Sequence, residues 1–306
     1  MGNILITGGT GMIGTAITKA LLAKGHTISI LSRRLPKAQA SKGLLYAEWN
    51  PAAGTIDPAA IQSADAIIHL AGANVADGRW TNKRKQEIVD SRVQSGQLLV
   101  KALKEIPNHV KTIVSASAIG WYGPDDIPIK PFVETDPPDN SFLGNTCQQW
   151  EMAIDPVHSL GKRLVTFRIG IVLSHEGGAY AEFRKPLNFG LATVLGSGRQ
   201  VISWIQIDDL VRLFIEAVEN EALSGIYNAV ADSPVTNKEL IKEMVKVKGG
   251  PHLTAPVPSF ALKLALGEMS VEILKSATVS NGKIKAAGFT FHYPDIKKAV
   301  RELEGK

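Results

Sequence analysis

Apolar residues follow two alternating patterns along this chain. Short continuous runs of β-branched and aliphatic residues, such as ILIT after Asn3, are typical of strands buried on both faces of a parallel sheet. Longer segments between them, such as Lys83–Lys104, carry apolar residues at helical spacing. The alternation predicts an α/β fold built on a doubly wound parallel sheet. The predicted strands are Asn3–Thr7, His26–Ser32, Leu44–Trp49, Ala66–Leu70, Lys111–Ser115, Lys162–Ile169 and Ile226–Val230.

The segment Asn3–Gly14, NILITGGTGMIG, has the pattern of a strand, a tight glycine turn and a helix start. Gly8 and Gly11 can adopt turn conformations closed to other residues, and Gly14 lets the helix pack close to the strand. The free N–H groups of the first helical turn and the helix dipole favour a phosphate there. We therefore predict a Rossmann-like dinucleotide site. The residues assigned to it are Thr7, Gly8, Gly9, Thr10, Gly11, Met12, Ile13 and Gly14.

Two arginines follow the second predicted strand. In a dinucleotide fold this position carries an acidic residue when the adenosine ribose keeps its 2′-hydroxyl, and an arginine when the ribose bears a 2′-phosphate. Ser32, Arg33 and Arg34 stand about 20 residues past the glycines, with no carboxylate among them. They predict NADP rather than NAD as the cofactor. The alternative is that the two arginines belong to a solvated surface.

Small residues follow the strand Ala66–Leu70. Because such residues let a ligand approach the backbone at the carboxyl end of a strand, we assign Leu70, Ala71 and Gly72 to the cofactor site. His69 is one candidate for a catalytic base. Its place inside an apolar strand favours a core histidine with satisfied hydrogen bonds.

Charged residues lie beside the apolar stripe of the predicted helix Lys83–Lys104. Glu87 and Arg92 stand near this stripe, so both could reach a ligand beside the sheet. Charges on a solvated helix face are the competing interpretation.

The segment Val114–Gly123, VSASAIGWYG, places polar side chains at and beyond the end of the fifth strand. Loops at the carboxyl ends of parallel strands are where open α/β sheets keep their chemistry. We assign Ser115 to the cofactor site and keep Ser117 and Tyr122 as candidates for catalysis.

Composition narrows the class of protein. The chain has 306 residues, a net charge of +5 and a pI of about 9.1. Its basic residues are scattered rather than clustered with aromatic residues, so we expect no nucleic-acid partner. No apolar run reaches the roughly 18 residues of a membrane span and no basic leader is evident, so we expect a cytoplasmic protein without a membrane partner. The single cysteine, Cys147, excludes an internal disulfide and a multi-cysteine metal site, and we predict no metal.

Several motifs resemble those of the extended short-chain dehydrogenase/reductase superfamily, which includes nucleotide-sugar epimerases. They are TGGTGMIG at Thr7–Gly14, HLAGA at His69–Ala73, SAS at Ser115–Ser117, Tyr122-Gly123, RIGIVL at Arg168–Leu173 and WIQIDDL at Trp204–Leu210. A narrower resemblance, to the "epimerase family" proteins of that superfamily, covers nearly the whole chain. It rests on SRR at Ser32–Arg34, GRW at Gly78–Trp80, SRV at Ser91–Val93, WE at Trp150–Glu151, LGEM at Leu266–Met269 and GFTFHYP at Gly288–Pro294.

The resemblance implies two parts of the chain. Residues 1–230 would form the NADP-binding Rossmann-like domain, and residues 231–306 a smaller α+β C-terminal lobe that closes over the cofactor. Residues 174–205 would contribute to the substrate lobe. The NADP contacts implied by the resemblance are Ser32, Arg33, Leu70, Ala71, Glu87, Arg92 and Ile171.

The chain departs from the superfamily at its catalytic pair. That pair is Tyr-x-x-x-Lys, in which the lysine and the nicotinamide charge lower the pKa of the tyrosine so that it can move a proton as hydride moves. The segment Ser141–Glu151, SFLGNTCQQWE, offers Phe142 and Thr146 in one register, or Leu143 and Cys147 in the other. Neither register supplies a phenol or an ammonium.

Ser117 and Tyr122 remain as the candidate catalytic residues. Ser117 matches the hydroxyl that binds the substrate oxygen in the superfamily, and Tyr122 is the nearest phenol in the sequence. The acidic residues on the loop after Tyr122 and the thiol of Cys147 are alternatives. Such loop acids are usually solvated, and a cysteine without a histidine partner is usually inert packing.

Two hypotheses of function follow. The first is an NADP-dependent oxidoreductase or epimerase that acts on a small carbonyl or nucleotide-linked substrate with a non-standard proton donor. The second is a non-catalytic NADP(H)-binding sensor or scaffold. The sequence leaves open whether the protein is an enzyme, and a homodimer is compatible with both hypotheses.

Overall fold

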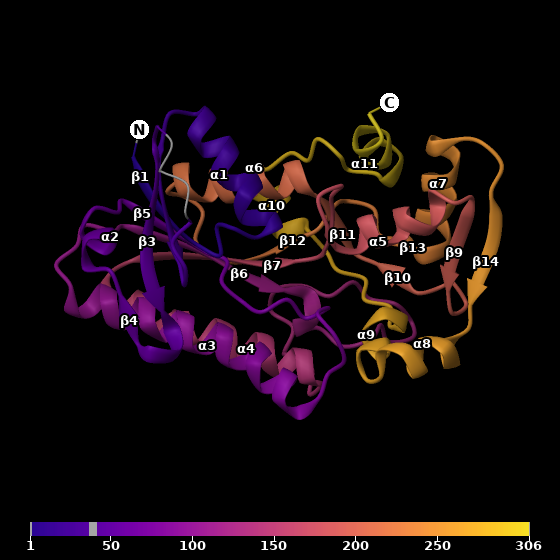
Figure 1. Ribbon diagram of the computed structural model, residues 1–306, viewed down its shortest axis with the longest axis horizontal. Helices are drawn as coiled ribbons and strands as arrows, with labels where there is room; N and C mark the ends of the chain where they lie inside the picture. Colours follow the sequence, from indigo (N-terminus) through magenta and orange to yellow (C-terminus); the bar gives the residue numbers. More distant parts are fainter. Residues whose placement is uncertain (1, 37–41, 306) are drawn as a thin grey trace.

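The computed structural model describes residues 2–36 and 42–305, and its centre is one large sheet (Figure 1). Its strands are β1 (Asn3–Thr7), β2 (Thr27–Ser32), β3 (Leu44–Asn50), β4 (Thr55–Ile56), β5 (Ala66–His69), β6 (Thr112–Ala118), β7 (Arg163–Ile169) and β12 (Gly225–Ala229). They lie in the order β12-β7-β6-β5-β1-β2-β3-β4, and all neighbours are parallel except β3 and β4. The strand order reverses at β1, as in doubly wound sheets. The predicted α/β class is confirmed.

Helices cover both faces of this sheet. The helices next to it are α1 (Met12–Ala23), α2 (Pro58–Gln62), α3 (Asn82–Glu105), α4 (Phe142–Ile154), α6 (Ile207–Glu219) and α10 (Gly282–Ala286). In Figure 1, α1 and α6 run above the sheet and α3 and α4 below it. Ile4 and Ile6 of β1 belong to the core between the sheet and the helices α1 and α6. Leu5 points to the opposite face and belongs to the core between the sheet and the helices α3 and α4. Burial of both faces explains the continuous apolar runs of the strands.

A smaller lobe lies on the right of Figure 1. It contains β8 (Ile171–Leu173), β9 (Leu191–Leu195), β10 (Val201–Ile202), β11 (Trp204–Gln206), β13 (Val235–Thr236), β14 (Leu253–Val257), α5 (Gly178–Leu187), α7 (Asn237–Lys248), α8 (Ser259–Leu266), α9 (Met269–Leu274) and α11 (Ile296–Leu303). β9 pairs with β14 and β10 with β13. Ile284, Phe289 and Phe291 return to the core of the main sheet. Segments from both sides of residue 230 thus share the core next to α1 and α6 and the core of the smaller lobe, and the predicted division there stays a prediction.

Two segments near the C-terminus differ from what their sequence patterns predict. Residues 259–276 carry apolar residues at the spacing of one amphipathic helix, but the chain forms α8 and α9, because Gly267 between them has a φ of +61° that ends a helix. The proline-rich segment 251–258 contains β14 instead of being only a link. β14 is an edge strand paired only with β9, so it accommodates Pro256, which has no N–H to donate.

Candidate dinucleotide site and active site

Glycines in and next to the turn between β1 and α1 leave no room for a side chain. Gly8 has a φ of +70°, and a Cβ on it would lie 2.9 Å from the carbonyl carbon of Leu70. A Cβ on Gly14 would lie 2.4 Å from the backbone oxygen of Gly8. Gly11 begins α1 without a side-chain cap, so the N–H groups of the first helical turn are open to an anion.

The other residues of the predicted turn contact different parts of the structure. A Cβ on Gly9 would lie 2.9 Å from a side-chain carbon of β2, and Thr10 is exposed. Ile13 packs against the core of the main sheet. The sulfur of Met12 lies 3.5 Å from the position of a Cβ on Gly177, so the turn contacts the loop that precedes α5.

His69 belongs to a buried chain of hydrogen bonds. Its Nδ1 lies 2.8 Å from Thr7 Oγ1, and its Nε2 lies 3.5 Å from Ser95 Oγ. Because Thr7 Oγ1 already accepts from the N–H groups of the two residues after His69, its own proton goes to Nδ1. Burial lowers the pKa of His69 to about 4, so the ring is neutral at pH 7. The core-histidine interpretation is confirmed.

Arg92 holds the loop that follows β5. Its Nη1 donates to the backbone oxygens of Ala73 at 3.0 Å and Ile88 at 2.9 Å, and its guanidinium lies 4.8 Å from the ring centroid of Trp150. A Cβ on Gly72 would lie 3.0 Å from Arg92 Cζ, so the glycine makes room for the guanidinium. Burial lowers the pKa of Arg92 to about 10, which leaves it charged at pH 7. No ion pair between described residues involves Arg92, so its charge can meet an anionic ligand.

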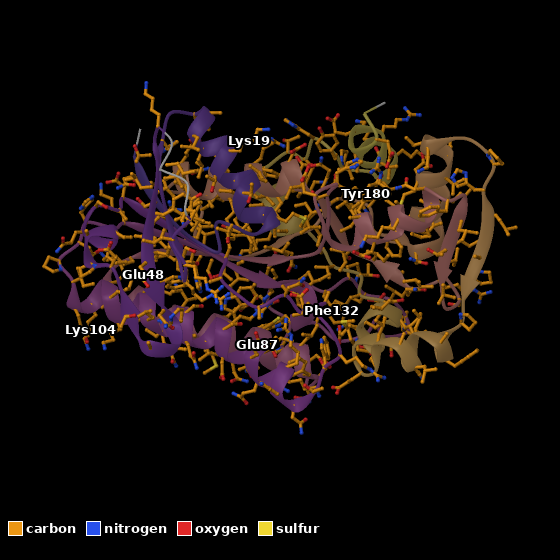
Figure 2. All side chains as sticks on the ribbon, viewed as in Figure 1. Lys19, Glu48, Glu87, Lys104, Phe132 and Tyr180 are labelled. Atoms are coloured by element: carbon orange, nitrogen blue, oxygen red, sulfur yellow. The ribbon has the colours of Figure 1, made fainter. Side chains whose placement is uncertain are left out.

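Ser32 and Glu87 have partners within the protein. Ser32 Oγ donates to the backbone oxygen of Arg34 at 2.7 Å and accepts from its N–H at 3.3 Å. Glu87, labelled on α3 in Figure 2, is exposed and forms an ion pair with Arg84 at 2.7 Å. Arg33 and Arg34 are exposed after β2. The cofactor contacts assigned to these residues stay predictions.

Ser117 lies in a buried ion-pair network. Its Oγ donates to Glu151 Oε1 at 2.6 Å, and Glu151 accepts from Nε and Nη2 of Arg168, each at 2.9 Å. This two-fold contact is a strong form of ion pair. The guanidinium of Arg168 also lies 3.6 Å from the centroid of a Trp121 ring. Ser115, on the same strand, is buried and donates to the neighbouring backbone oxygen at 3.2 Å.

Tyr122 lies at the other end of this hydrogen-bond network. Its hydroxyl donates to Asn228 Oδ1 at 2.7 Å and accepts from Arg168 Nη1 at 3.1 Å. Its ring stacks on Phe132, with the centroids 5.1 Å apart. Burial raises the pKa of Tyr122 to about 12, so the phenol keeps its proton. The catalytic roles of Ser117 and Tyr122 stay predictions, and in this geometry both hydroxyls have protein partners.

Apolar atoms occupy the start of α4, where the superfamily carries its catalytic pair. A Cβ on Gly120 would lie 3.2 Å from Leu143 Cβ and 3.6 Å from Cys147 Sγ, so these two residues face the turn that follows β6. Burial raises the pKa of Cys147 to about 12, which disfavours the reactive thiolate. Cys147 is buried, as its interpretation as a packing residue predicts.

The smaller lobe covers this position. Trp80 and Met269 are buried in one apolar cluster, and Leu143 packs against it. An ion pair of 2.5 Å between Lys85 of α3 and Glu268, which precedes α9, links the two parts of the chain at the same place. The cover leaves Phe142 and Leu143 at the start of α4 partly buried.

Sequence reasoning missed the partnership of Glu151 and Arg168. A signal was available, because Arg168 stands between Phe167 and Ile169 in an apolar strand, and a buried guanidinium needs an anionic partner. Nothing in the sequence identified Glu151 as that partner. The two residues are 17 positions apart, on different elements.

Two kinds of site are not found in the described chain. No helix among residues 2–36 and 42–305 combines the length and apolar character that a membrane crossing needs. The same residues contain no group of three or more His, Cys, Asp or Glu side chains that could hold a metal ion.

The parallel sheet with its reversal at β1, and the glycine turn at its edge, define a Rossmann-like protein of the short-chain dehydrogenase/reductase type. The model of the NAD dependent epimerase/dehydratase family matches residues 4–152, and a domain of unknown function, DUF1731, matches residues 257–303. Epimerase family protein ML0860 of Mycobacterium leprae is 36% identical over 97% of this chain and 94% of its own length. SSP1921 of Staphylococcus saprophyticus is 37% identical over 99% of both. The chain belongs to the epimerase family.

Solved structures agree with this assignment. The human epimerase family protein SDR39U1, crystallised with NADPH, superposes with a TM-score of 0.86, 30% identity and 99% coverage of both chains. A nucleoside-diphosphate sugar epimerase from Corynebacterium glutamicum superposes with a TM-score of 0.77 and 29% identity, over 98% of this chain and 58% of that one. A UDP-N-acetylglucosamine 4-epimerase from Bacillus cereus, at 20% identity and a TM-score of 0.77, shares the fold.

Proposed function

We propose that this protein binds NADP(H) across the carboxyl edge of the main sheet, with the pyrophosphate at the start of α1. The observation that carries the proposal is the glycine turn, where Gly8 and Gly14 exclude a Cβ and no side chain caps the first N–H groups of α1. Arg92 adds a positive charge that no described carboxylate neutralises. The human relative crystallised with NADPH supports the same cofactor.

The exposed pair Arg33-Arg34 supports NADP over NAD, because we propose that it binds the 2′-phosphate. A hydrogen bond to a charged group contributes about 1.5–3 kcal/mol, which is roughly ten- to hundredfold in affinity. Arg33→Asp removes such a bond and adds repulsion, so it should weaken NADPH by at least this factor. It should leave NADH nearly unchanged, because NADH has no 2′-phosphate.

Fluorescence titrations with both dinucleotides measure these affinities. Arg199→Asp is the matched control, since Arg199 is also exposed but lies between β9 and β10 in the smaller lobe. It should bind NADPH and NADH as the wild type does. Equal losses of NADPH and NADH affinity in Arg33→Asp would overturn the assignment of NADP.

The function that the geometry supports best is NADP(H) binding by a sensor or scaffold, without the proton relay of the superfamily. Leu143 and Cys147 face the turn that follows β6, where a tyrosine and a lysine would be needed. The hydroxyls of Ser117 and Tyr122 are buried and bonded to Glu151 and to other protein groups. No candidate residue is therefore arranged to exchange a proton with a substrate.

A second candidate function is NADP(H)-dependent reduction or epimerisation of a small carbonyl or nucleotide-linked substrate. The apolar cover formed by Trp80 and Met269 over Leu143 favours it, because hydride transfer benefits from a site without water. The wild-type protein, present in excess over NADPH, can be mixed with a panel of both substrate classes while NADPH absorbance is followed. Binding of NADPH without oxidation supports the first function, and oxidation that depends on one substrate establishes the second.

A further inference from the structure

A hollow is lined by residues of α7 and α11. Figure 1 shows these two helices in its upper right part, away from the main sheet. Its volume is about 290 Å³, close to the lower end of small-molecule sites, which is about 300 Å³. Glu243, Lys246 and Val247 of α7 line it together with Arg301 of α11. None of these residues belongs to the dinucleotide site.

Glu243 is the unusual member of this group. Its side chain is only 7% exposed, and it lies on the helix that also contributes Leu240 and Met244 to the core of the smaller lobe. Its Oε1 is buried and accepts no hydrogen bond from any described residue. A buried acceptor without a partner destabilises the folded chain, and more so when it is charged. A hydrogen-bond donor placed in the hollow would recover that free energy.

The other charges of the hollow are positive and lie at its rim. Lys246 and Arg301 are exposed, and neither forms an ion pair within 4.0 Å with Glu243 or with another described carboxylate. The hollow therefore has a negative charge in its wall and two positive charges toward solvent. A simple cation would meet repulsion at the rim, and a simple anion would meet repulsion from Glu243.

We propose that this hollow binds a small zwitterion of the amino-acid type. The ammonium group donates to Glu243 Oε1, and the carboxylate lies between Lys246 and Arg301. Both ends of such a ligand meet opposite charge, and the ammonium supplies the donor that Glu243 lacks. The site is independent of the dinucleotide site, so the protein would carry a second ligand whether or not it is an enzyme.

The full-length protein can be titrated with β-alanine, and with propylammonium and propionate, which each retain one end of β-alanine. Backbone amide chemical shifts report the place and the affinity. We expect β-alanine to shift the amides of α7 and α11 and to bind at least about tenfold more tightly than either half-ligand. Glu243→Gln should abolish this preference, because it removes the charge but keeps the shape. Arg301→Ala should reduce β-alanine to the affinity of propylammonium.

Three results would overturn the proposal. The first is that the amide signals of α7 and α11 do not shift at about 50 mM β-alanine, where a ligand with a Kd of about 1 mM is nearly saturating. The second is that β-alanine and one of the half-ligands bind with equal affinity. The third is that Glu243→Gln binds β-alanine as the wild type does. If Glu243→Gln does not fold, Arg301→Ala gives the same decision from the exposed side of the hollow. NADPH titration of the same samples separates this result from the proposed function, because the affinity for NADPH should be unchanged in both variants.

Discussion

Acid should destabilise this protein through His69 before most carboxylates take up protons. The ring is fully buried and its pKa falls from 6.5 to about 4, chiefly because burial disfavours the charged form. Between these two values the unfolded chain binds a proton that the folded chain does not, so the free energy of unfolding decreases as pH falls. The stabilisation is complete above pH 6.5 and is lost toward pH 4, at about 1.4 kcal/mol per pH unit. From about pH 7 to pH 5 the loss is about 2 kcal/mol.

Urea unfolding at a series of pH values between these limits measures this loss. His69→Gln cannot bind the proton, so its free energy of unfolding should decrease by about 2 kcal/mol less than that of the wild type over the same range. The variant will be less stable at every pH because it loses the contact with Thr7, but only the pH dependence tests the reasoning. His292→Gln removes an exposed histidine as a control and should keep the wild-type dependence. An identical pH dependence in His69→Gln and the wild type would refute the argument.

Three further substitutions test the network and the glycine turn. Gly14→Ala places a Cβ 2.4 Å from a backbone oxygen, so NADPH affinity measured by fluorescence should fall by at least about tenfold; wild-type affinity would contradict the assigned turn. Arg168→Met leaves the carboxylate of Glu151 buried without its ion-pair partner, so the free energy of unfolding in urea should decrease by about 3–5 kcal/mol. The double variant with Glu151→Leu should recover a large part of this loss. Tyr122→Phe should cost about 1 kcal/mol of stability and leave NADPH affinity unchanged, whereas a large loss of affinity would place the phenol at the cofactor.

Features that depend on a few consecutive residues could be predicted from the sequence. The glycine turn is one, because the backbone conformation of Gly8 and the close packing of Gly14 follow from the absence of a Cβ. The helix α7 is another. Its start at Thr236, with Glu239 three residues later, forms the capping box that the sequence predicts.

The absence of the catalytic pair was also visible in the sequence, since neither register at the start of α4 offers a phenol or an ammonium. The sequence did not show which of the two registers faces the sheet. Only the packing of α4 against β6 turns Leu143 and Cys147 toward Gly120. The lobe that covers them comes from residues more than a hundred positions later, around Met269.

By itself, the sequence determined the class of fold and the place of the glycine turn, because strand patterns, glycine turns and helix caps are properties of short segments. The tertiary structure decided what the polar side chains do. One hydrogen-bond network joins four segments through Ser117, Glu151, Arg168 and Tyr122. It forms because a buried polar group is stable only with a hydrogen-bond partner, and the fold places these four side chains next to one another. Glu243 is the converse case, since the packing of the smaller lobe buries one of its carboxylate oxygens without a hydrogen-bond partner among the described residues.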